Sequence, residues 1–321
     1  MTDANALSLS RFSPSAIVAM DDEGRITDMN AAAEVLLAST THDALGRAYT
    51  EVFGPSLADR LVPLFLRVAR TGVDRTPQTL EATLPNGRRA TLRANAGPLV
   101  DTNGALIGMV FAAEDRSALR RYVGAELAAA VDSRPSFLDL GGKRQIVSVL
   151  HADVRGYSTL AEHTPPEEVM RLLLSYHGAA VEALREQGAT IDRFIGDAVL
   201  ALWNAPSPQQ DHAVMAIRGG LGMLEAAARA GEDMRYGVGV HTGPAVVGNL
   251  GSADLMSYTA IGDTVNVAAR LQSGAGPGEL VCSAATAEAV GARLRATSLG
   301  ALPVKGRTTP VEAYRVEGLA S

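Results

Sequence analysis

Short apolar segments separated by turns dominate the first part of the chain. Apolar runs at 16–20 and 25–29 predict two β-strands. Asn30, a residue type favoured at helix N-caps, precedes an Ala-rich segment that predicts a short helix. A further helix is predicted over 57–70, and Pro63 is expected to break or kink it because proline lacks the N–H that an interior position donates.

The pattern then changes to strict alternation. Residues 78–84 and 89–94 alternate between apolar and polar positions, and 105–111 form an apolar run, with turn residues between the segments. This pattern predicts a three-stranded antiparallel meander. Together with the earlier strands and helices it indicates a small α+β domain over 13–115, after a loosely ordered segment at 1–12.

A helical linker is predicted over 116–145. Apolar residues recur at helical spacing between 116 and 133, which predicts one helix, and Pro135 ends it. The apolar stripe of this helix has two interpretations. It could pair with the same stripe of a second chain as a short parallel coiled coil, or it could pack on its own preceding domain. The pattern favours neither.

The rest of the chain alternates strands with longer amphipathic helices. An apolar, β-branched run from Ile146 predicts a buried strand that ends near Asp153, and a helix is predicted over 164–187. Two apolar runs then flank Gly196-Asp197, which predicts a hairpin with these two residues at its tip.

Three more segments complete this pattern. A helix is predicted from Asp211, followed by a strand and turn over 235–243 and a returning strand over 245–250. Another helix follows Gly262-Asp263, and a closing strand is predicted over 311–316. Alternating strands and helices of this kind are typical of a second α+β domain.

Two carboxylates are the first candidates for chemistry. Asp153 comes where the first strand ends, just before a Gly156-Tyr157 turn and a helix start, and Asp197 lies at the hairpin tip. A strand, a helix and a hairpin can bring both side chains to one edge of a sheet. Two neighbouring carboxylates are costly unless a cation neutralises them, and two divalent ions held there would suit phosphoryl transfer.

A second set of polar residues follows later in the chain. Asn266 and Arg270 are four residues apart, so they share one helix face. An amide beside a guanidinium suits a ribose and a phosphate oxygen. The surrounding helix is otherwise apolar, so we expect the pair not to be a plain solvent-exposed face. Lys305 lies on a turn before the closing strand.

Composition changes this picture mainly by exclusion. The length of 321 residues favours two domains, and 47% hydrophobic residues allow each to bury a core. A net charge of −6 offers no basic footprint for nucleic acid, and Cys282 alone makes neither a disulfide nor a multi-cysteine metal site. No apolar stretch approaches a membrane span, so we expect a cytoplasmic protein without a membrane partner.

Residues 146–317 closely resemble the catalytic domain of bacterial class III nucleotidyl cyclases, and we assign 146–321 to this domain. The resemblance implies a ferredoxin-like βαββαβ core and a head-to-tail homodimer with its active sites at the interface. The matching motifs are Leu150-x-Ala152-Asp153-Val154-Arg155-Gly156-Tyr157-Ser158, Phe194-Ile195-Gly196-Asp197-Ala198, Gly239-Val240-His241-Thr242-Gly243, Tyr258-Thr259-Ala260-Ile261-Gly262-Asp263-Thr264-Val265-Asn266-x-Ala268-Ala269-Arg270-Leu271 and Val304-Lys305-Gly306.

The resemblance also implies roles for single residues. Asp153 and Asp197 would bind two Mg²⁺ or Mn²⁺ ions, with help from the Val154 carbonyl. Asn266 would orient the ribose and Arg270 would stabilise the transition state.

Further residues would bind the phosphates. Lys305 would hold the terminal phosphates, and Gly156 and Tyr157 would lie against the substrate at the helix start. The metal-binding residues would come from one chain, and the Asn, Arg and Lys from the other, so a monomer would be inactive.

Base selection is where the chain departs from the family pattern. Adenylate cyclases of this type usually have Lys at the position of Arg193, paired with Asp or Thr at the position of Thr259, whereas guanylate cyclases usually have Glu and a small residue or Cys. Thr259 fits the adenine pattern, but Arg193 fits neither. Arg can donate to adenine N1 or to guanine O6. Alternatively, Arg193 pairs with Asp192 or a partner carboxylate and leaves the base pocket.

The first domain, 13–115, resembles a PAS domain, a sensory and dimerising module. The resemblance rests on the order of its elements and on Asp21-x-x-Gly24-Arg25-Ile26-x-x-Met29-Asn30, Gly104-x-x-Ile107-Gly108 and Glu114-Asp115-Arg116. The module has no Cys, which argues against thiol–flavin photochemistry, and His42 is its one histidine. A lone histidine is more typical of a surface position than of a haem ligand, so we expect a relay module without a cofactor; haem ligation by His42 is the alternative.

The sequence therefore predicts a PAS-regulated adenylate cyclase that converts ATP to 3′,5′-cyclic AMP and pyrophosphate in a homodimer. A guanylate or mixed-specificity cyclase is the first alternative. A catalytically silent, cyclase-like nucleotide-binding and dimerisation module is the second.

Overall fold

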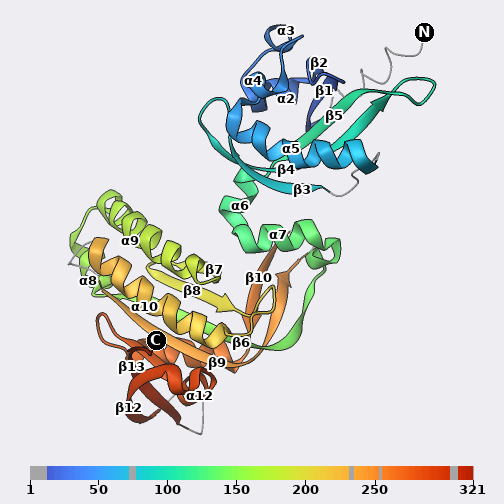
Figure 1. The fold of residues 1–321 in the computed structure, drawn as a ribbon. Coiled ribbons are helices and arrows are strands. Elements are labelled where there is room, and N and C mark those ends of the chain that lie inside the picture. The colour runs from blue at the N-terminus through green and yellow to red at the C-terminus, as the bar shows by residue number, and fades with distance from the viewer. Residues whose placement is uncertain (1–12, 72–76, 231–234, 253–254, 304–309, 321) are drawn as a thin grey trace. The chain divides into compact units, whose positions relative to one another are not determined.

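The structure is a computed structural model in which the chain forms two compact units, Met1–Val123 and Gly124–Ser321 (Figure 1). The described residues are 13–71, 77–230, 235–252, 255–303 and 310–320. The segment 1–12, expected to be loosely ordered, and Lys305 lie outside the described residues. Both units combine helices with antiparallel strands, which confirms the predicted α+β class.

The first unit is built on a five-stranded antiparallel sheet in the order β2-β1-β5-β4-β3. The predicted meander is confirmed, because β3 pairs with β4 and β4 pairs with β5. Its elements are β1 (Ala16–Asp21), β2 (Ile26–Met29), α2 (Ala31–Leu37), α3 (Thr41–Ala44), α4 (Tyr49–Val52), α5 (Gly54–Thr71), β3 (Gln78–Thr83), β4 (Arg89–Val100), β5 (Leu106–Asp115) and α6 (Ser117–Val123).

Pro63 does not end the helix in which it lies. Helix α5 continues through it from Gly54 to Thr71. Leu57, Leu61 and Leu64 are almost completely buried on one face of this helix. Burial of three leucines stabilises the helix by several kcal/mol, which exceeds the cost of about 3 kcal/mol for an interior proline.

The connector is two helices rather than the one predicted. Helix α6 ends at Val123, and α7 (Ala125–Ser133) begins after Gly124, whose φ of 80° is not helical. Glycine reaches this backbone conformation without the steric cost that other residues meet, so it can separate two helices that sequence periodicity merges.

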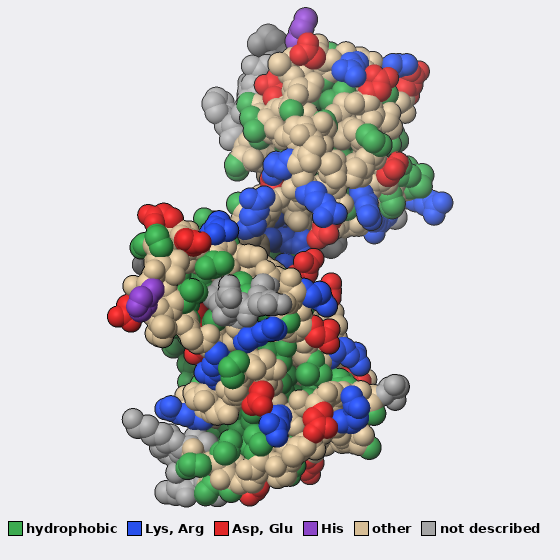
Figure 2. Space-filling view, turned by 90° about the vertical axis from the view of Figure 1, so that its left-hand side faces the viewer, with side chains coloured by type: hydrophobic (Ala, Val, Ile, Leu, Met, Phe, Trp, Pro, Cys, Tyr) green, Lys and Arg blue, Asp and Glu red, His purple; other side chains and the backbone are tan. Residues whose placement is uncertain are grey.

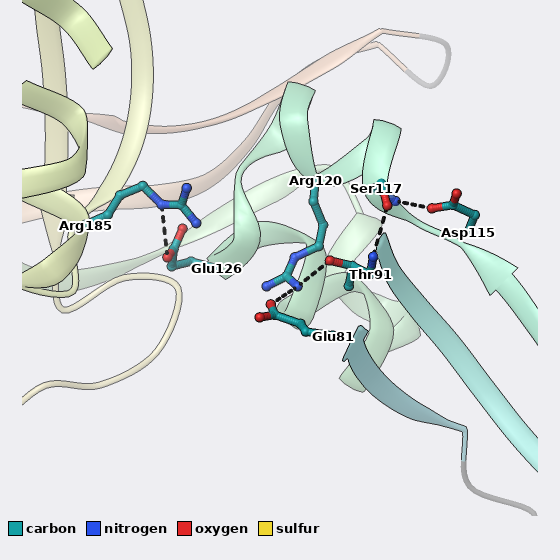
Figure 3. A network of polar contacts seen from close by, with 7 residues as sticks. All are labelled: Glu81, Thr91, Asp115, Ser117, Arg120, Glu126 and Arg185. Atoms are coloured by element: carbon teal, nitrogen blue, oxygen red, sulfur yellow. Dashed lines mark hydrogen bonds and ion pairs between the residues drawn. The ribbon is translucent and has the colours of Figure 1, made fainter. Parts of the chain in front are cut away.

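Each connector helix is fixed to its own unit (Figure 3). In the first unit, Arg120 of α6 donates to Glu81 at 2.7 Å and to Thr91 at 3.1 Å. In the second unit, Glu126 of α7 lies 3.9 Å from Arg185. The break at Gly124 therefore coincides with a change of packing partner.

The second unit holds an eight-stranded sheet in the order β12-β13-β11-β9-β6-β8-β7, with β10 paired to β9. The segment β9-β6-β8-β7, with helices between β6 and β7 and between β8 and β9, is the predicted ferredoxin-like βαββαβ core. Its elements after α7 are η1 (Pro135–Leu138), β6 (Gly141–Arg155), α8 (Tyr157–His163), α9 (Pro166–Glu186), β7 (Thr190–Ile195), β8 (Ala198–Trp203), α10 (His212–Ala230), β9 (Arg235–Gly251), β10 (Met256–Ile261), α11 (Asp263–Gly274), β11 (Leu280–Ser283), α12 (Ala284–Val290), η2 (Gly291–Arg293), β12 (Leu294–Leu302) and β13 (Val311–Leu319).

The predicted turn at Thr242-Gly243 is wrong. Strand β9 runs without interruption from Arg235 to Gly251, and the returning strand is β10. Strand β6 pairs with β9 along its whole length, from Gly141 opposite Asn249 to Arg155 opposite Arg235. This long ladder keeps β9 extended through a segment whose residues alone favour a turn.

Strand β6 has a core on each side. Leu150 and Ala152 belong to a cluster that also contains Tyr176 of α9 and Ile217 of α10. Val147 and Val149 belong to a different cluster that contains Ala268 of α11. Because successive side chains of a strand point to opposite faces, β6 is buried on both sides and is held rigidly.

Candidate active site

Asp153 and Asp197 come together at one end of β6. Asp153 lies near the end of this strand, and Asp197 lies in the turn between β7 and β8. The backbone N–H of Val154 donates to Oδ2 of Asp197 across 3.3 Å. Gly196 has a φ of 62°, which the tight turn requires. The predicted closeness of the two carboxyl groups is seen in the structure, and their role as metal ligands stays a prediction.

The pair is electrostatically costly as it stands. Burial, a side-chain hydrogen bond with Asp153 and the charge of Asp153 together raise the pKa of Asp197 to about 7. Within the described residues, no cluster of three or more His, Cys, Asp or Glu side chains surrounds them. Two carboxylates and the nearby Val154 carbonyl are hard oxygen donors, which fit Mg²⁺ or Mn²⁺ and not a softer metal.

His177 of α9 supports the turn that carries Asp197. Its Nε2 lies 3.2 Å from the carbonyl oxygen of Gly196, and its Nδ1 lies 2.9 Å from the hydroxyl of Tyr236. A carbonyl can only accept, so Nε2 carries the proton and Nδ1 accepts from the tyrosine. Burial lowers the pKa of His177, which favours this neutral form. Its ring also packs 4.9 Å from that of Phe194.

Gly156 and Tyr157 lie at the start of α8. Gly156 is the N-cap with a φ of 77°, and it forms no side-chain cap. Tyr157 is partly buried and packs against the core under β6. The first turn of α8 therefore follows directly after Asp153 and Val154, as the sequence predicts.

Arg193 and Thr259 are joined through Asp192. Nε of Arg193 donates to Oδ1 of Asp192 at 2.8 Å, and the Thr259 hydroxyl donates to Oδ2 at 2.5 Å. The Asp192 side chain is 1% exposed, whereas that of Arg193 is 44% exposed. Of the two arrangements considered for Arg193, the structure contains the ion pair with Asp192. This pair uses Nε alone, so Arg193 need not leave the base pocket to form it, because its outer guanidinium nitrogens can still reach a base.

Asn266 and Arg270 lie on the exposed side of α11. Thr264, Val267 and Leu271 form its buried side, while Asn266 and Arg270 are both exposed. Our expectation that the pair would not be exposed is therefore wrong for a single chain. Among the described residues, neither side chain forms a hydrogen bond or ion pair with Asp153 or Asp197.

Several large hydrophobic side chains of this unit are also exposed. They lie on β6, β7, β9 and β10 or beside them, and on the face shown in Figure 2 green side chains reach the surface of the unit between charged ones. These residues are Ile146, Phe194, Ile195, Val246, Leu250, Leu255 and Ile261. Large apolar side chains exposed on the strands of a sheet are typical of a protein–protein contact surface.

Sequence reasoning missed two residues of the site. His177 follows Tyr176 on an amphipathic helix, and nothing in its sequence context points to Gly196. The sequence indicates Asp192 only as a partner of Arg193. Its contact with Thr259 joins residues 67 positions apart in the chain, and no local pattern predicts such a contact.

Comparison with known proteins places this geometry in a family. Residues 142–318 match the model of the adenylate and guanylate cyclase catalytic domain, and residues 11–121 match a PAS fold. The catalytic-domain match covers more than half of the 321 residues. The chain therefore contains a nucleotidyl cyclase domain preceded by a PAS domain. It belongs to the family of adenylate and guanylate cyclases.

The similar proteins include some named as adenylate cyclases and others named as guanylyl cyclases. The chain is 36% identical over 187 residues to Adenylate cyclase 1 of Rhizobium meliloti. The matched region covers 55% of this chain and 28% of that protein. The guanylyl cyclase Cya2 matches with a TM-score of 0.55 and 33% identity over 57% of this chain and 96% of its own. The adenylyl cyclase CyaB from P. aeruginosa matches with a TM-score of 0.53 and 31% identity, over 55% and 96%.

The chain spans less than half the length of the first curated relatives it matches. No helix among the described residues has the length and apolar character needed to cross a membrane.

Proposed function

We propose that this chain is an adenylate cyclase that works as a homodimer and is regulated by its PAS domain. One observation carries the proposal. A single chain pairs Asp153 with Asp197, while Asn266 and Arg270 face solvent on another element. A cyclase site needs both sets, and two chains in a head-to-tail arrangement would supply one set each.

The metal end of the site would be formed by one chain. Asp153, Asp197 and the Val154 carbonyl would hold two Mg²⁺ or Mn²⁺ ions. Bound there, the ions would favour loss of the proton from the 3′-hydroxyl and neutralise charge on the phosphates. The raised pKa of Asp197 supports this assignment, because a cation offsets both the burial of the carboxylate and its repulsion from Asp153, which together raise that pKa.

The partner chain would supply the other groups. Asn266 would position the ribose so that its 3′-oxygen faces the α-phosphorus, and Arg270 would neutralise charge that develops on the phosphoryl oxygens. Lys305 would hold the terminal phosphates. Gly156 and Tyr157 follow Asp153 and Val154 on the metal-binding chain and would lie against the phosphates from that side. The 3′-hydroxyl would give its proton to water and its oxygen would bond to the α-phosphorus. The bond from that phosphorus to the pyrophosphate oxygen would break, and pyrophosphate would leave with the electron pair of that bond.

The exposed hydrophobic residues support the dimer. Ile146, Ile195, Val246 and Ile261 lie on the strands that hold the site or pair with them, and each is more than 40% exposed in one chain. A homodimer interface would remove these side chains from water, which is favourable by about 25 cal/mol per Å² of apolar area.

Assay of the purified protein with Mn²⁺ and either ATP or GTP tests the proposal, with the products identified by chromatography. We expect cyclic AMP and pyrophosphate from ATP, and less product from GTP. Cyclic GMP as the main product would support a guanylate cyclase, whose solved relative Cya2 has a similar fold. No cyclic product from either nucleotide would overturn the enzyme assignment and leave a nucleotide-binding or dimerisation module.

A further inference from the structure

Asp192 is an extra residue in its strand, and both of its carboxylate oxygens are occupied. The pairing of β7 with β8 shifts between Ile191 and Arg193, so Asp192 has no partner in the ladder and forms a β-bulge. Its side chain is 1% exposed. A bulge can redirect a side chain, and here it places a carboxylate in the interior between β7 and β10, which are not neighbours in the sheet.

The contacts of Asp192 fix the proton of the Thr259 hydroxyl. Asp192 forms an ion pair with Arg193, and a carboxylate can only accept hydrogen bonds. The hydroxyl therefore donates to Oδ2, at 2.5 Å. The other acceptor within reach, the carbonyl oxygen of Ala260, is 3.4 Å away and neutral, so the carboxylate takes the proton.

Arg193 is oriented by the same carboxylate. Its Nε–H is occupied by Oδ1, which leaves the outer nitrogens of the guanidinium, and these can only donate. The Thr259 oxygen has lone pairs left and no second proton, so it can only accept from another group. Asp192 thus gives the two residues opposite and fixed hydrogen-bonding roles.

We infer that Asp192 is a positioning residue that makes the site selective for adenine over guanine. Adenine has a donor at its 6-amino group and an acceptor at N1, which match an accepting Thr259 and a donating Arg193. Guanine has an acceptor at O6, which would face the lone pairs of Thr259 with no proton between them. This inference rests on the proposed function, because it takes Thr259 and Arg193 as the residues that contact the base.

The Asp192→Asn variant tests the inference. Because Nε of Arg193 can only donate, the amide oxygen stays on the Arg193 side and the amide N–H₂ turns to Thr259. The amide then donates to the hydroxyl, whose own proton becomes free to reach guanine O6. We expect the ratio of kcat/KM for ATP to that for GTP to fall by on the order of tenfold, with a gain for GTP.

A double-mutant cycle separates a positioning role from a structural one. Thr259→Val removes the hydroxyl and should also lower the ratio. If Asp192 acts through Thr259, Asp192→Asn should change the ratio little further in the Thr259→Val background. The matched control is Asp211→Asn, because Asp211 also pairs with an arginine, Arg293, at 3.0 Å. This control should leave the ratio unchanged, and melting temperatures identify any variant that fails to fold.

A binding measurement distinguishes failure of this inference from failure of the proposed function. 3′-Deoxy-ATP and 3′-deoxy-GTP cannot cyclise, so their Kd values with Mn²⁺ report base selection whether or not the protein is active. Tighter binding of 3′-deoxy-ATP that Asp192→Asn abolishes would support the inference even if no cyclic product forms. An unchanged ratio in folded Asp192→Asn protein, additive effects in the cycle, or a wild-type preference for GTP would overturn it.

Discussion

The backbone N–H of Val154 donates to Oδ2 of Asp197 and joins the end of β6 to the turn between β7 and β8. This bond places a second carboxyl group next to Asp153, and burial together with that closeness raises the pKa of Asp197. The two carboxyl groups of the proposed metal site are thus brought together by a backbone hydrogen bond.

Stability of the metal-free protein should fall as the pH rises from about 4 to about 7. Asp197 has a folded-state pKa of about 7, above its ordinary value of 3.8, so the folded state keeps a proton that the unfolded state has released in this window. We expect a loss of about 1 kcal/mol after allowing for solvent screening of a partly exposed carboxyl group. Chemical denaturation at several pH values without divalent ions measures it. The Asp197→Asn variant should show a flatter profile, and an equal pH dependence in both proteins would contradict the assignment.

Replacement of His177 by Phe should weaken the metal end of the site. Phenylalanine keeps the packing on Phe194 but loses the donor to Gly196 and the acceptor for the buried Tyr236 hydroxyl. We expect a stability loss of about 1–2 kcal/mol and a several-fold rise in the Mn²⁺ concentration that gives half-maximal activity. The KM for nucleotide should change less. His163→Phe, at an exposed position on α8, is the control, and an unchanged Mn²⁺ requirement in folded His177→Phe protein would argue against the support role.

Gly239→Ala should displace the helix that carries Asn266 and Arg270. A Cβ at Gly239 would come within 2.2 Å of the carbonyl oxygen of Ala268 and the backbone nitrogen of Gln272, both in α11. Backbone atoms cannot move aside as a flexible side chain can, so we expect a loss of about 1–3 kcal/mol and a large loss of activity. Gly178→Ala is the matched control, because its Cβ would meet nothing within 4 Å. Equal melting temperatures for the two variants would show that α11 does not need this close approach.

Two inactive variants should restore activity when mixed. Asp153→Ala removes the metal end of a site and Arg270→Ala removes the partner's contribution, so a mixed dimer keeps one intact site of two. With random exchange of subunits, the mixture should reach about a quarter of wild-type activity. Asp153→Ala mixed with Asp197→Ala is the control and should stay inactive, because both changes affect the same end of the site. No recovery in dimers shown to exchange would rule out a shared site.

The elements that sequence predicted well are those whose signals are local. Gly196-Asp197 between two apolar runs is sufficient to predict a hairpin tip, and the strand before Asp153 is marked by its β-branched residues. The pairing of Asp192 with Thr259 is not local, since it depends on a bulge in β7 and on the path of β10. The extension of β9 through Thr242 likewise comes from its ladder with β6 and not from its own residues.

Helical periodicity also predicts one helix where the structure has two, separated at Gly124. The apolar spacing of 116–133 continues smoothly across Gly124, and only the backbone shows that its φ of 80° divides the segment. The spacing of apolar residues indicates which side chains share a helix face, but it does not indicate that the backbone changes direction at a single residue. Helix α6 is bonded to the first unit and α7 to the second. This difference in packing partners, and not the composition of either helix, accounts for the break at Gly124.

Because Asn266 and Arg270 are exposed on a lone chain, the activity would depend on the concentration of the protein. In the proposed dimer, an isolated chain has no complete site, so dilution below the dimer dissociation constant removes activity without unfolding the protein. Product formation would then rise with the square of chain concentration when the protein is scarce and only linearly when it is abundant. The number of copies in a cell would itself set a threshold for the output, before any ligand or signal acts on the first domain.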